Sequence, residues 1–499
     1  MTDHRGDERT RSAENSGDDS NGGDSGSGGG DEDEEATNGV AAVDEYVEAN
    51  FDAFLGDLET LLRQPSISAT GEGVDECTSL VERLCAEYGF DETTAVDTPG
   101  QPAIVAHARA AAADDRPTVL VYGHYDVQPV TPEAWSTPPF EPTRRTTPDG
   151  DERIYARGAG DNKGQWFTHL CAVRGWRETG GLPANVVLLL EGEEESGSPN
   201  LDRVVDQHGD ALAADLAYVA DGPIDPSGRP HVLMGARGMV YAQIDARGPD
   251  RDLHSGNYGG PVPNPAWELV RLLSSMKDDE GKVTVEGYYD DVRPIDDRDA
   301  EALDAMAFDE AAIRADLDLD GFAVAPGESY LETLLYHPTL NIAGFTSGYG
   351  GEGTKTIIPS RAQAKVDMRL VADQDPDDIY ERFADHIERH RTGTVRLDVS
   401  KLGVMYPQRT PLDHPVVEPV TAAVGDAWEA DPIRKPTLGG SLPTAAFVRH
   451  LSLPCVVVPY ANSDENNHSP DENLSIECFR NGIRTTTRLL AELRSADLD

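Results

Sequence analysis

The side chains of this chain best suited to chemistry are histidines and carboxylates that follow short apolar runs. His124 and Asp126 lie directly after the run 119–122, which has the length and composition of a buried strand. Imidazole is a common metal ligand, and a carboxylate two residues further on can accept a hydrogen bond from the second ring nitrogen. An isolated pair of this kind is more often a structural histidine beside a turn, so its interpretation depends on the rest of the chain.

Further groups of the same kind follow other apolar runs or turns. They are Asp161, Glu194, Glu195, Asp221 and His468. Two histidines together with carboxylates suit zinc or manganese, since both ions accept nitrogen and oxygen ligands. Because neighbouring side chains of an extended chain point in opposite directions, one of the two adjacent glutamates can bind a metal while the other acts as a base. A glutamate run after a strand is otherwise usually a solvated loop.

The segments that hold these groups alternate between strand and helix patterns. Apolar runs predict strands at 103–108, 119–122, 185–190, 216–220 and 455–459, and helical spacing predicts helices at 40–63, 77–88, 165–178, 416–428 and 474–494. Strands that alternate with helices and end in polar clusters predict an α/β fold with a mostly parallel sheet. The glycine-rich segment 154–164 has the spacing of neither a Walker loop nor a dinucleotide fingerprint, so no phosphate loop is predicted there.

The pattern changes between residues 233 and 405. Strand-like runs at 238–246, 340–344 and 362–370, with helical patterns at 265–276 and 378–390, predict a smaller inserted α+β domain that serves as a lid or for dimerisation. The main domain is therefore expected in two parts, 39–232 and 406–499. Residues 1–38 are a low-complexity run of mostly Gly, Ser, Asp and Glu, and we expect them to form a disordered acidic tail.

The chain has 499 residues and a formal net charge of −49. Beyond the tail, regular apolar periodicity favours a folded protein with an acidic surface, as halophilic proteins have, and this charge argues against nucleic acid as a partner. Five cysteines without CxxC spacing indicate reduced thiols. No apolar run reaches the roughly 20 residues of a membrane span, and no basic segment followed by an apolar one suggests secretion. A cytoplasmic protein is expected.

Five sequence blocks, in order, resemble the M20 family of zinc peptidases. They are GHYDVQP (123–129), ARGAGDNKG (156–164), EGEEESGS (191–198), DLHSG (252–256) and NHS (467–469). The resemblance extends over residues 45–495 and is strongest to the cytosolic dipeptidase and carnosinase branch. It implies a metal-dependent hydrolase that cleaves the amide bond of dipeptides or short peptides.

The resemblance also implies a role for each candidate residue of the metal centre. One ion would be held by His124, Asp161 and Asp221, and a second by Asp161, Glu195 and His468. Asp161 would therefore bridge two zinc or manganese ions in each subunit. Glu194 would be the general base, and Asp126 would orient His124. The family also has a cis peptide bond after the bridging aspartate.

Four further residues match substrate-binding positions of the family: His254, Thr356, Arg369 and Ser441. By resemblance, His254 would reach the active site of a partner subunit and stabilise the oxyanion, which requires a homodimer built through the inserted domain. Arg369 would bind the C-terminal carboxylate of a small peptide, since a guanidinium can hold a carboxylate with two hydrogen bonds.

Two alternatives remain open at the level of the sequence. An N-acyl-amino-acid amidohydrolase or deacetylase, similar to acetylornithine deacetylase or succinyl-diaminopimelate desuccinylase, would use the same metal centre on a capped substrate. A non-catalytic metal-binding relative would be expected to lack Glu194 or a metal ligand, and all of these are present.

Overall fold

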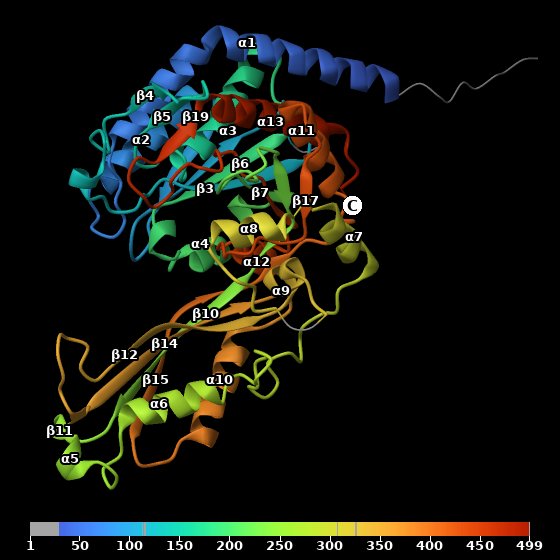
Figure 1. The fold of residues 1–499 in the computed structure, drawn as a ribbon. Coiled ribbons are helices and arrows are strands. Elements are labelled where there is room, and N and C mark those ends of the chain that lie inside the picture. The colour runs from blue at the N-terminus through green and yellow to red at the C-terminus, as the bar shows by residue number, and fades with distance from the viewer. Residues whose placement is uncertain (1–28, 112, 114–115, 307, 325–326, 499) are drawn as a thin grey trace, which may run out of the picture.

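The computed structural model describes residues 29–111, 113, 116–306, 308–324 and 327–498, with side chains from residue 39 onward. Among these residues the largest sheet has eight strands, in the order β1-β2-β6-β3-β7-β18-β8-β17. Their bounds are Glu92–Val96 (β1), Ala103–Ala108 (β2), Asn185–Glu191 (β6), Thr118–His124 (β3), Leu216–Val219 (β7), Cys455–Val457 (β18), His231–Leu233 (β8) and Ile433–Lys435 (β17). Figure 1 shows this sheet in the upper part of the molecule, beneath the long helix α1, Gly29–Arg63.

The centre of the large sheet is parallel. Strand β3 lies between β6 and β7 and runs parallel to both, and β7 is parallel to β18. The pairs β1–β2 and β2–β6 are antiparallel, as is the contact between β18 and β8. The predicted α/β fold with a mostly parallel sheet is confirmed, with antiparallel pairing towards both edges of the sheet.

Helices cover both faces of this sheet, as strands that are apolar on both sides require. Val119 and Val121 of β3 belong to the core beneath α1, whereas Leu120 and Tyr122 belong to the core on the opposite face. The helices on the first face are α1, α2 (Val74–Glu87), α3 (Lys163–Thr179), α11 (Val417–Trp428) and α13 (Ile476–Ser495), and those on the second are α4 (Leu201–Gln207) and α12 (Ala445–Leu451). Within the described ranges, no helix has both the length and the apolar character needed to cross a membrane.

A separate core lies against an antiparallel sheet of four strands, counted over the described residues, in the order β12-β14-β10-β15. The elements that enclose this core are β10 (Gly238–Arg247), β12 (Thr339–Ser347), β14 (Arg361–Leu370), β15 (Arg396–Met405), α6 (Pro265–Ser274) and α10 (Pro376–His390). Side chains of β10 are alternately buried and half-buried, because the helices cover one face of the sheet only. We call these six elements the second body; Figure 1 shows it below the large sheet.

The chain enters the second body through β9 (Gly235–Ala236) and leaves it towards β16 (Gln408–Arg409), and these two short strands pair with each other. The second core is therefore inserted between two parts of the first. The exact domain limits, 233 and 405, stay a prediction. The remaining elements are β4 (Thr143–Thr146), β5 (Glu152–Tyr155), β19 (Asn473–Ser475), β11 (Leu253–His254), β13 (Ile357–Ile358), α5 (Ser255–Tyr258), α7 (Asp297–Ala305), α8 (Glu310–Asp316) and α9 (Tyr330–Tyr336).

Two expectations about element bounds need correction. Helix α1 begins at Gly29 rather than at residue 40, so it includes residues 29–38 of the predicted tail. Residues 1–28 lie outside the described residues, and the acidic tail stays a prediction. The predicted helix 474–494 begins at Ile476, because Asn473–Ser475 pairs with β5 and the Ser475 side chain then caps α13.

Candidate metal centre

The predicted ligands lie on loops that meet at the carboxyl ends of neighbouring parallel strands, where α/β sheets bind ligands. His124 is the last residue of β3, and Asp221 lies two residues beyond the end of the adjacent strand β7. Asp161 lies on the loop before α3, and its Asp161–Asn162 peptide bond is cis, as the family resemblance implies. His468 comes from the loop between β18 and β19.

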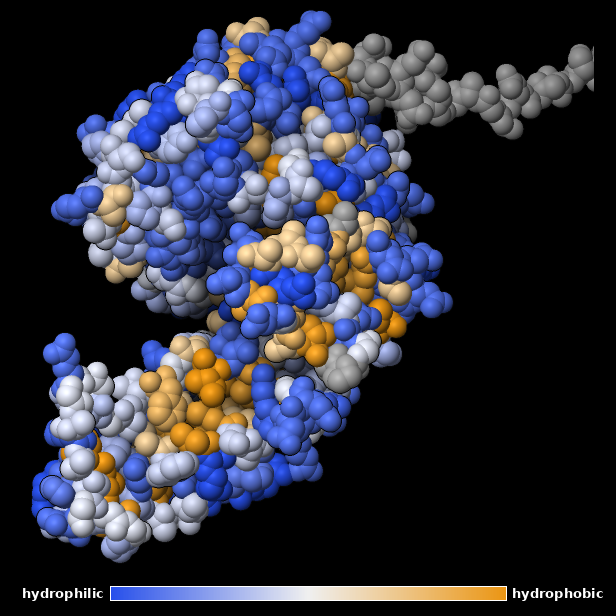
Figure 2. Space-filling view, viewed as in Figure 1, coloured by the Kyte–Doolittle hydropathy of each residue, from blue (hydrophilic) through white to orange (hydrophobic). Residues whose placement is uncertain are grey.

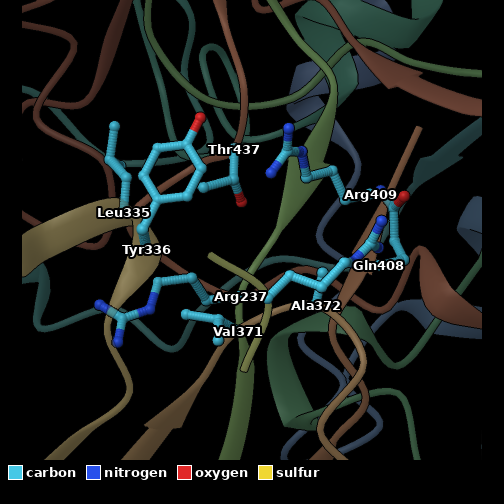
Figure 3. A pocket seen from close by; sticks show the side chains of 9 residues that line it. Arg237, Leu335, Tyr336, Val371, Ala372, Gln408, Arg409 and Thr437 are labelled. Atoms are coloured by element: carbon cyan, nitrogen blue, oxygen red, sulfur yellow. The ribbon is translucent and has the colours of Figure 1, made fainter. Parts of the chain in front are cut away.

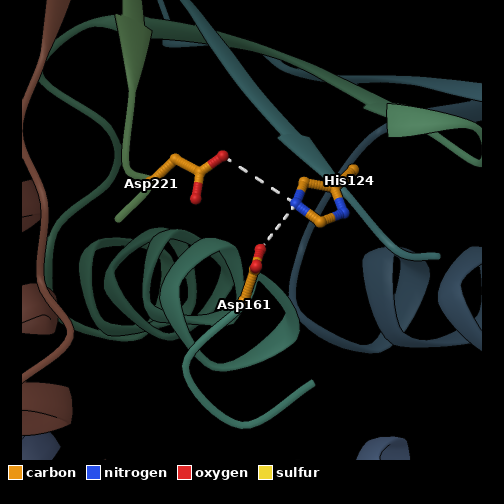
Figure 4. Close-up of side chains that lie close together, drawn as sticks. All are labelled: His124, Asp161 and Asp221. Atoms are coloured by element: carbon orange, nitrogen blue, oxygen red, sulfur yellow. Dashed lines mark hydrogen bonds and ion pairs between the residues drawn. The ribbon is translucent and has the colours of Figure 1, made fainter. Parts of the chain in front are cut away.

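These loops form two clusters of possible metal ligands that share Asp161. The first contains His124, Asp161 and Asp221, all buried, and the second contains Asp161, Glu195 and His468. In the first, His124 Nε2 lies 3.1 Å from Asp161 Oδ1 and 3.8 Å from Asp221 Oδ2. Figure 4 shows both carboxylates directed at this one ring nitrogen. In the second, His468 Nε2 lies 3.1 Å from both Asp161 Oδ2 and Glu195 Oε2.

Glu194 and Glu195 lie close to this centre, but their backbone conformation differs from the one that the sequence suggested. They belong to a 3₁₀ turn, Glu194–Ser196, and not to extended chain. The two side chains still diverge, because successive residues of a 3₁₀ helix are rotated by a third of a turn. Glu195 joins the second cluster, while Glu194 Oε2 lies 4.0 Å from His124 Nε2 and belongs to neither cluster.

Asp126 connects the histidine to this glutamate turn. It is fully buried, and its carboxylate lies 3.4 Å from His124 Nδ1, while its own backbone carbonyl lies 3.1 Å from the same atom. The two carboxylate oxygens also accept the backbone N–H groups of Glu194 and Glu195, at 3.2 and 3.1 Å. One carboxylate thus fixes the ring of a predicted ligand and the backbone of the predicted base.

Three further residues, for which the sequence analysis predicted no role, hold the ligand loops. Gln128 donates to the side-chain and backbone oxygens of Glu195, at 2.9 and 3.2 Å. Asn162 donates to the carbonyl of Ala220 and accepts from the backbone of His124. Glu472 accepts the backbone N–H groups of Gly160 and Asp161, and pairs with Arg157. Gln128 and Asn162 lie within the sequence blocks and Glu472 lies three residues after the last one, but only the contacts show what each residue holds.

The carboxylates of this centre carry more negative charge than its two histidines can offset. Burial, with the nearby charge of Asp161, raises the pKa of Asp221 to about 7. Burial also raises the pKa of Glu194 well above its usual range, and the charges of Asp221 and Asp161 add to this effect. Glu465 is 2% exposed, and neither of its carboxylate oxygens has a hydrogen-bond partner among the described residues. Burial, then the charge of Asp161, raise the pKa of Glu465 to about 10.

This donor set fits divalent cations. Imidazole nitrogen and carboxylate oxygen are the ligands that zinc and manganese accept, and positive charge at the two clusters would relieve the repulsion among the carboxylates. The shared position of Asp161 between the clusters suits two neighbouring ions. Gln128 and Asp126 supply the kind of hydrogen bonds that commonly orient metal ligands.

The predicted substrate contacts fall into two pairs. His254 and Thr356 lie together, because β11 pairs with β13 and the backbone N–H of Ser255 donates to the carbonyl of Thr356 at 3.1 Å. This pair lies beside α5, at the end of the second body that is farther from the large sheet in Figure 1. Arg369, on β14, donates to the Ser441 hydroxyl at 2.9 Å. A single chain therefore does not bring His254 and Thr356 to the metal clusters.

Comparison with known proteins identifies the family. Residues 120–492 match the family described as peptidase family M20/M25/M40. The chain belongs to this family. It is similar to a Cys-Gly metallodipeptidase of Candida albicans, with 30% identity over 381 residues that cover 74% of this chain and 77% of the relative.

Two further likenesses span most of the chain. The human Beta-Ala-His dipeptidase is 29% identical over 388 residues, which cover 75% of each protein. Among solved structures, the M20 family metallo-carboxypeptidase Sso-CP2 of Sulfolobus solfataricus is similar with a TM-score of 0.80 and 34% identity, covering 88% of this chain and 99% of that one.

If the two clusters bind two ions, His468→Ala should remove one of them, because His468 belongs to the second cluster only. We expect the wild-type protein to retain two zinc equivalents after dialysis and the variant about one, since lost ligands weaken metal sites strongly. Elemental analysis and calorimetric titration with Zn²⁺ measure this. His208→Ala, outside both clusters, is the matched control; two retained equivalents in His468→Ala would exclude His468 as a ligand.

Proposed function

We propose that this chain is a metal-dependent dipeptidase that hydrolyses the amide bond of dipeptides or short peptides with a free carboxyl end. The observation that carries the proposal is the pair of clusters sharing Asp161, with Glu194 beside them but outside both. This arrangement supports the proposal because it offers ligands that could hold two metal ions, with one nearby carboxylate that could act as a base.

Zinc or manganese ions held by these residues would polarise the scissile carbonyl and lower the pKa of water at the site towards about 7. Glu194 then accepts a proton from the attacking water and returns it to the leaving amine. Its backbone is fixed by Asp126, and its side chain is 16% exposed, so it remains accessible to a substrate. Asp126 holds the His124 ring in position throughout.

The pair Arg369 and Ser441 is our candidate for binding the substrate carboxylate. Arg369 is partly exposed, pairs with Asp367 at 3.2 Å and donates to Ser441, which together set the direction of its guanidinium. A free carboxyl group is common to the substrates of dipeptidases and carboxypeptidases, the two activities named for the relatives above. A guanidinium beside a hydroxyl suits this group.

We propose a homodimer in which His254 acts on the partner's site. His254 Nδ1 accepts the backbone N–H of Gly256 at 3.0 Å, so Nε2 carries the ring proton and can donate it to an oxyanion. The edge strand β12 exposes Ile342 and Phe345, at 55% and 43%, and an open edge with apolar side chains is a typical pairing surface. Figure 2 shows apolar side chains gathered on the second body.

We also propose that the protein works in the cytoplasm of a salt-adapted cell. Its net charge of −49 would be screened by salt, which reduces self-repulsion of the folded state. All five cysteines are buried and free, as suits a reducing compartment.

A deacylase acting on N-acyl amino acids remains the alternative, because it would use the same metal centre and the same carboxylate site. The two differ in whether the substrate has a free ammonium group or an acyl cap. Hydrolysis of Ala-Leu and of N-acetyl-Leu, compared in multi-molar salt with Zn²⁺ or Mn²⁺, tests the proposal. We expect Ala-Leu to have the higher kcat/KM; a preference for N-acetyl-Leu would transfer the chain to the deacylase class.

For Glu194→Gln, we expect kcat to fall by a factor of about 10²–10⁴, the usual contribution of a general base, with metal content unchanged. Glu193→Gln is the matched control, because Glu193 bonds to Asn200 and belongs to neither cluster. Turnover close to the wild-type rate in Glu194→Gln would remove this residue as the base.

For His254→Ala, we expect a dimer of normal size in sedimentation and a loss of kcat of about 10²–10³, as for removal of one oxyanion donor. Subunit mixing tests the cross-subunit role. In an equal mixture with Glu194→Gln, half of the dimers are mixed and one of their two sites is complete, so about a quarter of wild-type activity should return. No recovery after subunit exchange would place His254 in its own subunit's site or outside any site.

A further inference from the structure

Arg237 occupies the place where the chain passes from the large sheet to the second body. It lies between β9 and β10 and is 3% exposed. It lines a cavity of about 20 Å³. Figure 3 shows its guanidinium directed away from Arg409 and Gln408, which line the opposite side. Neither the sequence blocks nor the metal centre gives this arginine a role.

The hydrogen bonds of Arg237 tie together the segments that form the proposed carboxylate site. Its backbone N–H donates to the carbonyl of Gly440, next to Ser441, at 3.0 Å. Its guanidinium donates to the carbonyl of Arg369 at 3.4 Å. Two shorter bonds, of 2.6 and 2.8 Å, reach the carbonyls of Leu334 and His337 at the end of α9. One residue therefore contacts the backbone of Arg369 and the backbone of Gly440, the residue before Ser441.

Arg237 also differs from its neighbours in the cavity wall by its lack of an acidic partner. Arg409 pairs with Asp299, and Arg293 pairs with Asp373. Within the part of the chain that the structure describes, the Arg237 guanidinium bonds to carbonyl oxygens only and forms no ion pair. Buried charges are normally paired, so a counter-charge from outside the chain would be favourable here.

The charge of Arg369 lies close enough to act on Arg237. Burial, then repulsion from Arg369, lower the pKa of Arg237 to about 10. Two guanidinium groups that repel each other both gain from an anion bound at one of them. A peptide carboxylate on Arg369 would supply that anion, whereas a C-terminal amide would not.

We infer that Arg237 is a positioning residue for the substrate carboxylate: it holds Arg369 and the Ser441 loop together and adds a buried positive charge behind them. This inference rests on the proposed function, because it assumes that Arg369 and Ser441 bind a carboxyl group. The contacts of Arg237 connect the second body with the large-sheet domain, because Arg369 lies on β14 of the second body and Ser441 lies in the chain that follows that body.

The test compares Arg237→Gln with the wild-type enzyme on Ala-Leu and on its C-terminal amide, Ala-leucinamide. We expect KM for Ala-Leu to rise about tenfold with kcat little changed, and KM for the amide to stay the same, because only the free acid uses the charge. Arg237→Lys keeps the positive charge, so its KM for Ala-Leu should rise by less than that of Arg237→Gln. It also provides the same comparison if the glutamine variant does not fold. An equal effect on both substrates would mean a merely structural role and would overturn the inference.

Arg409→Gln is the matched control, since it removes a guanidinium from the same cavity without touching Arg369 or the Ser441 loop. A rise in KM for Ala-Leu as large as in Arg237→Gln would also overturn the inference. Calorimetric titration with leucine and leucinamide separates this inference from the proposed function, because it needs no turnover. If wild-type protein fails to hydrolyse Ala-Leu, the proposed function fails, while selective loss of leucine binding in Arg237→Gln would still support the role of Arg237.

Discussion

Carboxylates are crowded around Asp161, and this crowding is the main electrostatic constraint on the fold of the surrounding loops. Asp161 and Asp221 are buried, and Glu194, Glu195 and Glu465 lie nearby. Such a group is unfavourable in a folded protein unless positive charge or hydrogen-bond donors offset it. The chain supplies donors from its backbone and from His124 and His468, and the remaining excess fits two divalent ions.

The surrounding hydrogen bonds are arranged to keep these carboxylates apart in fixed positions. Asp126 takes two backbone donors from the glutamate turn, and Glu472 takes two from the loop of Asp161. Gln128 holds Glu195, so each ligand loop is bound to another element of the fold. The parallel strands β3, β6 and β7 make this possible, because their ends bring separate loops to one edge of the sheet.

The second body supplies a different set of groups and is joined to the domain of the large sheet by two chain segments, at β9 and β16. The proposed carboxylate site lies near these segments. There Arg369 contacts Ser441, and Arg237 bonds to the backbone of Arg369 and of Gly440. His254 and Thr356 lie at the far end of the same body. In our proposals, substrate binding and oxyanion stabilisation therefore depend on how the bodies and subunits are placed, while the metal centre depends on the large sheet alone.

The sequence by itself determined the α/β class, most of the central strands and helices, and the identity of the residues that the structure gathers into two clusters. It could do so because strand periodicity is local and because some ligands follow an apolar run, as His124 does after 119–122. Asp161 and His468 do not, and their place among the ligands came from the family resemblance. It did not determine the 3₁₀ turn at Glu194 or the roles of Gln128, Glu472 and Arg237. Those depend on partners far away in the chain, such as the contact of Arg237 with Gly440 or of Glu472 with Gly160. Only tertiary structure decides such contacts, because a hydrogen bond requires two groups within about 3 Å, and sequence spacing does not give distances between remote segments.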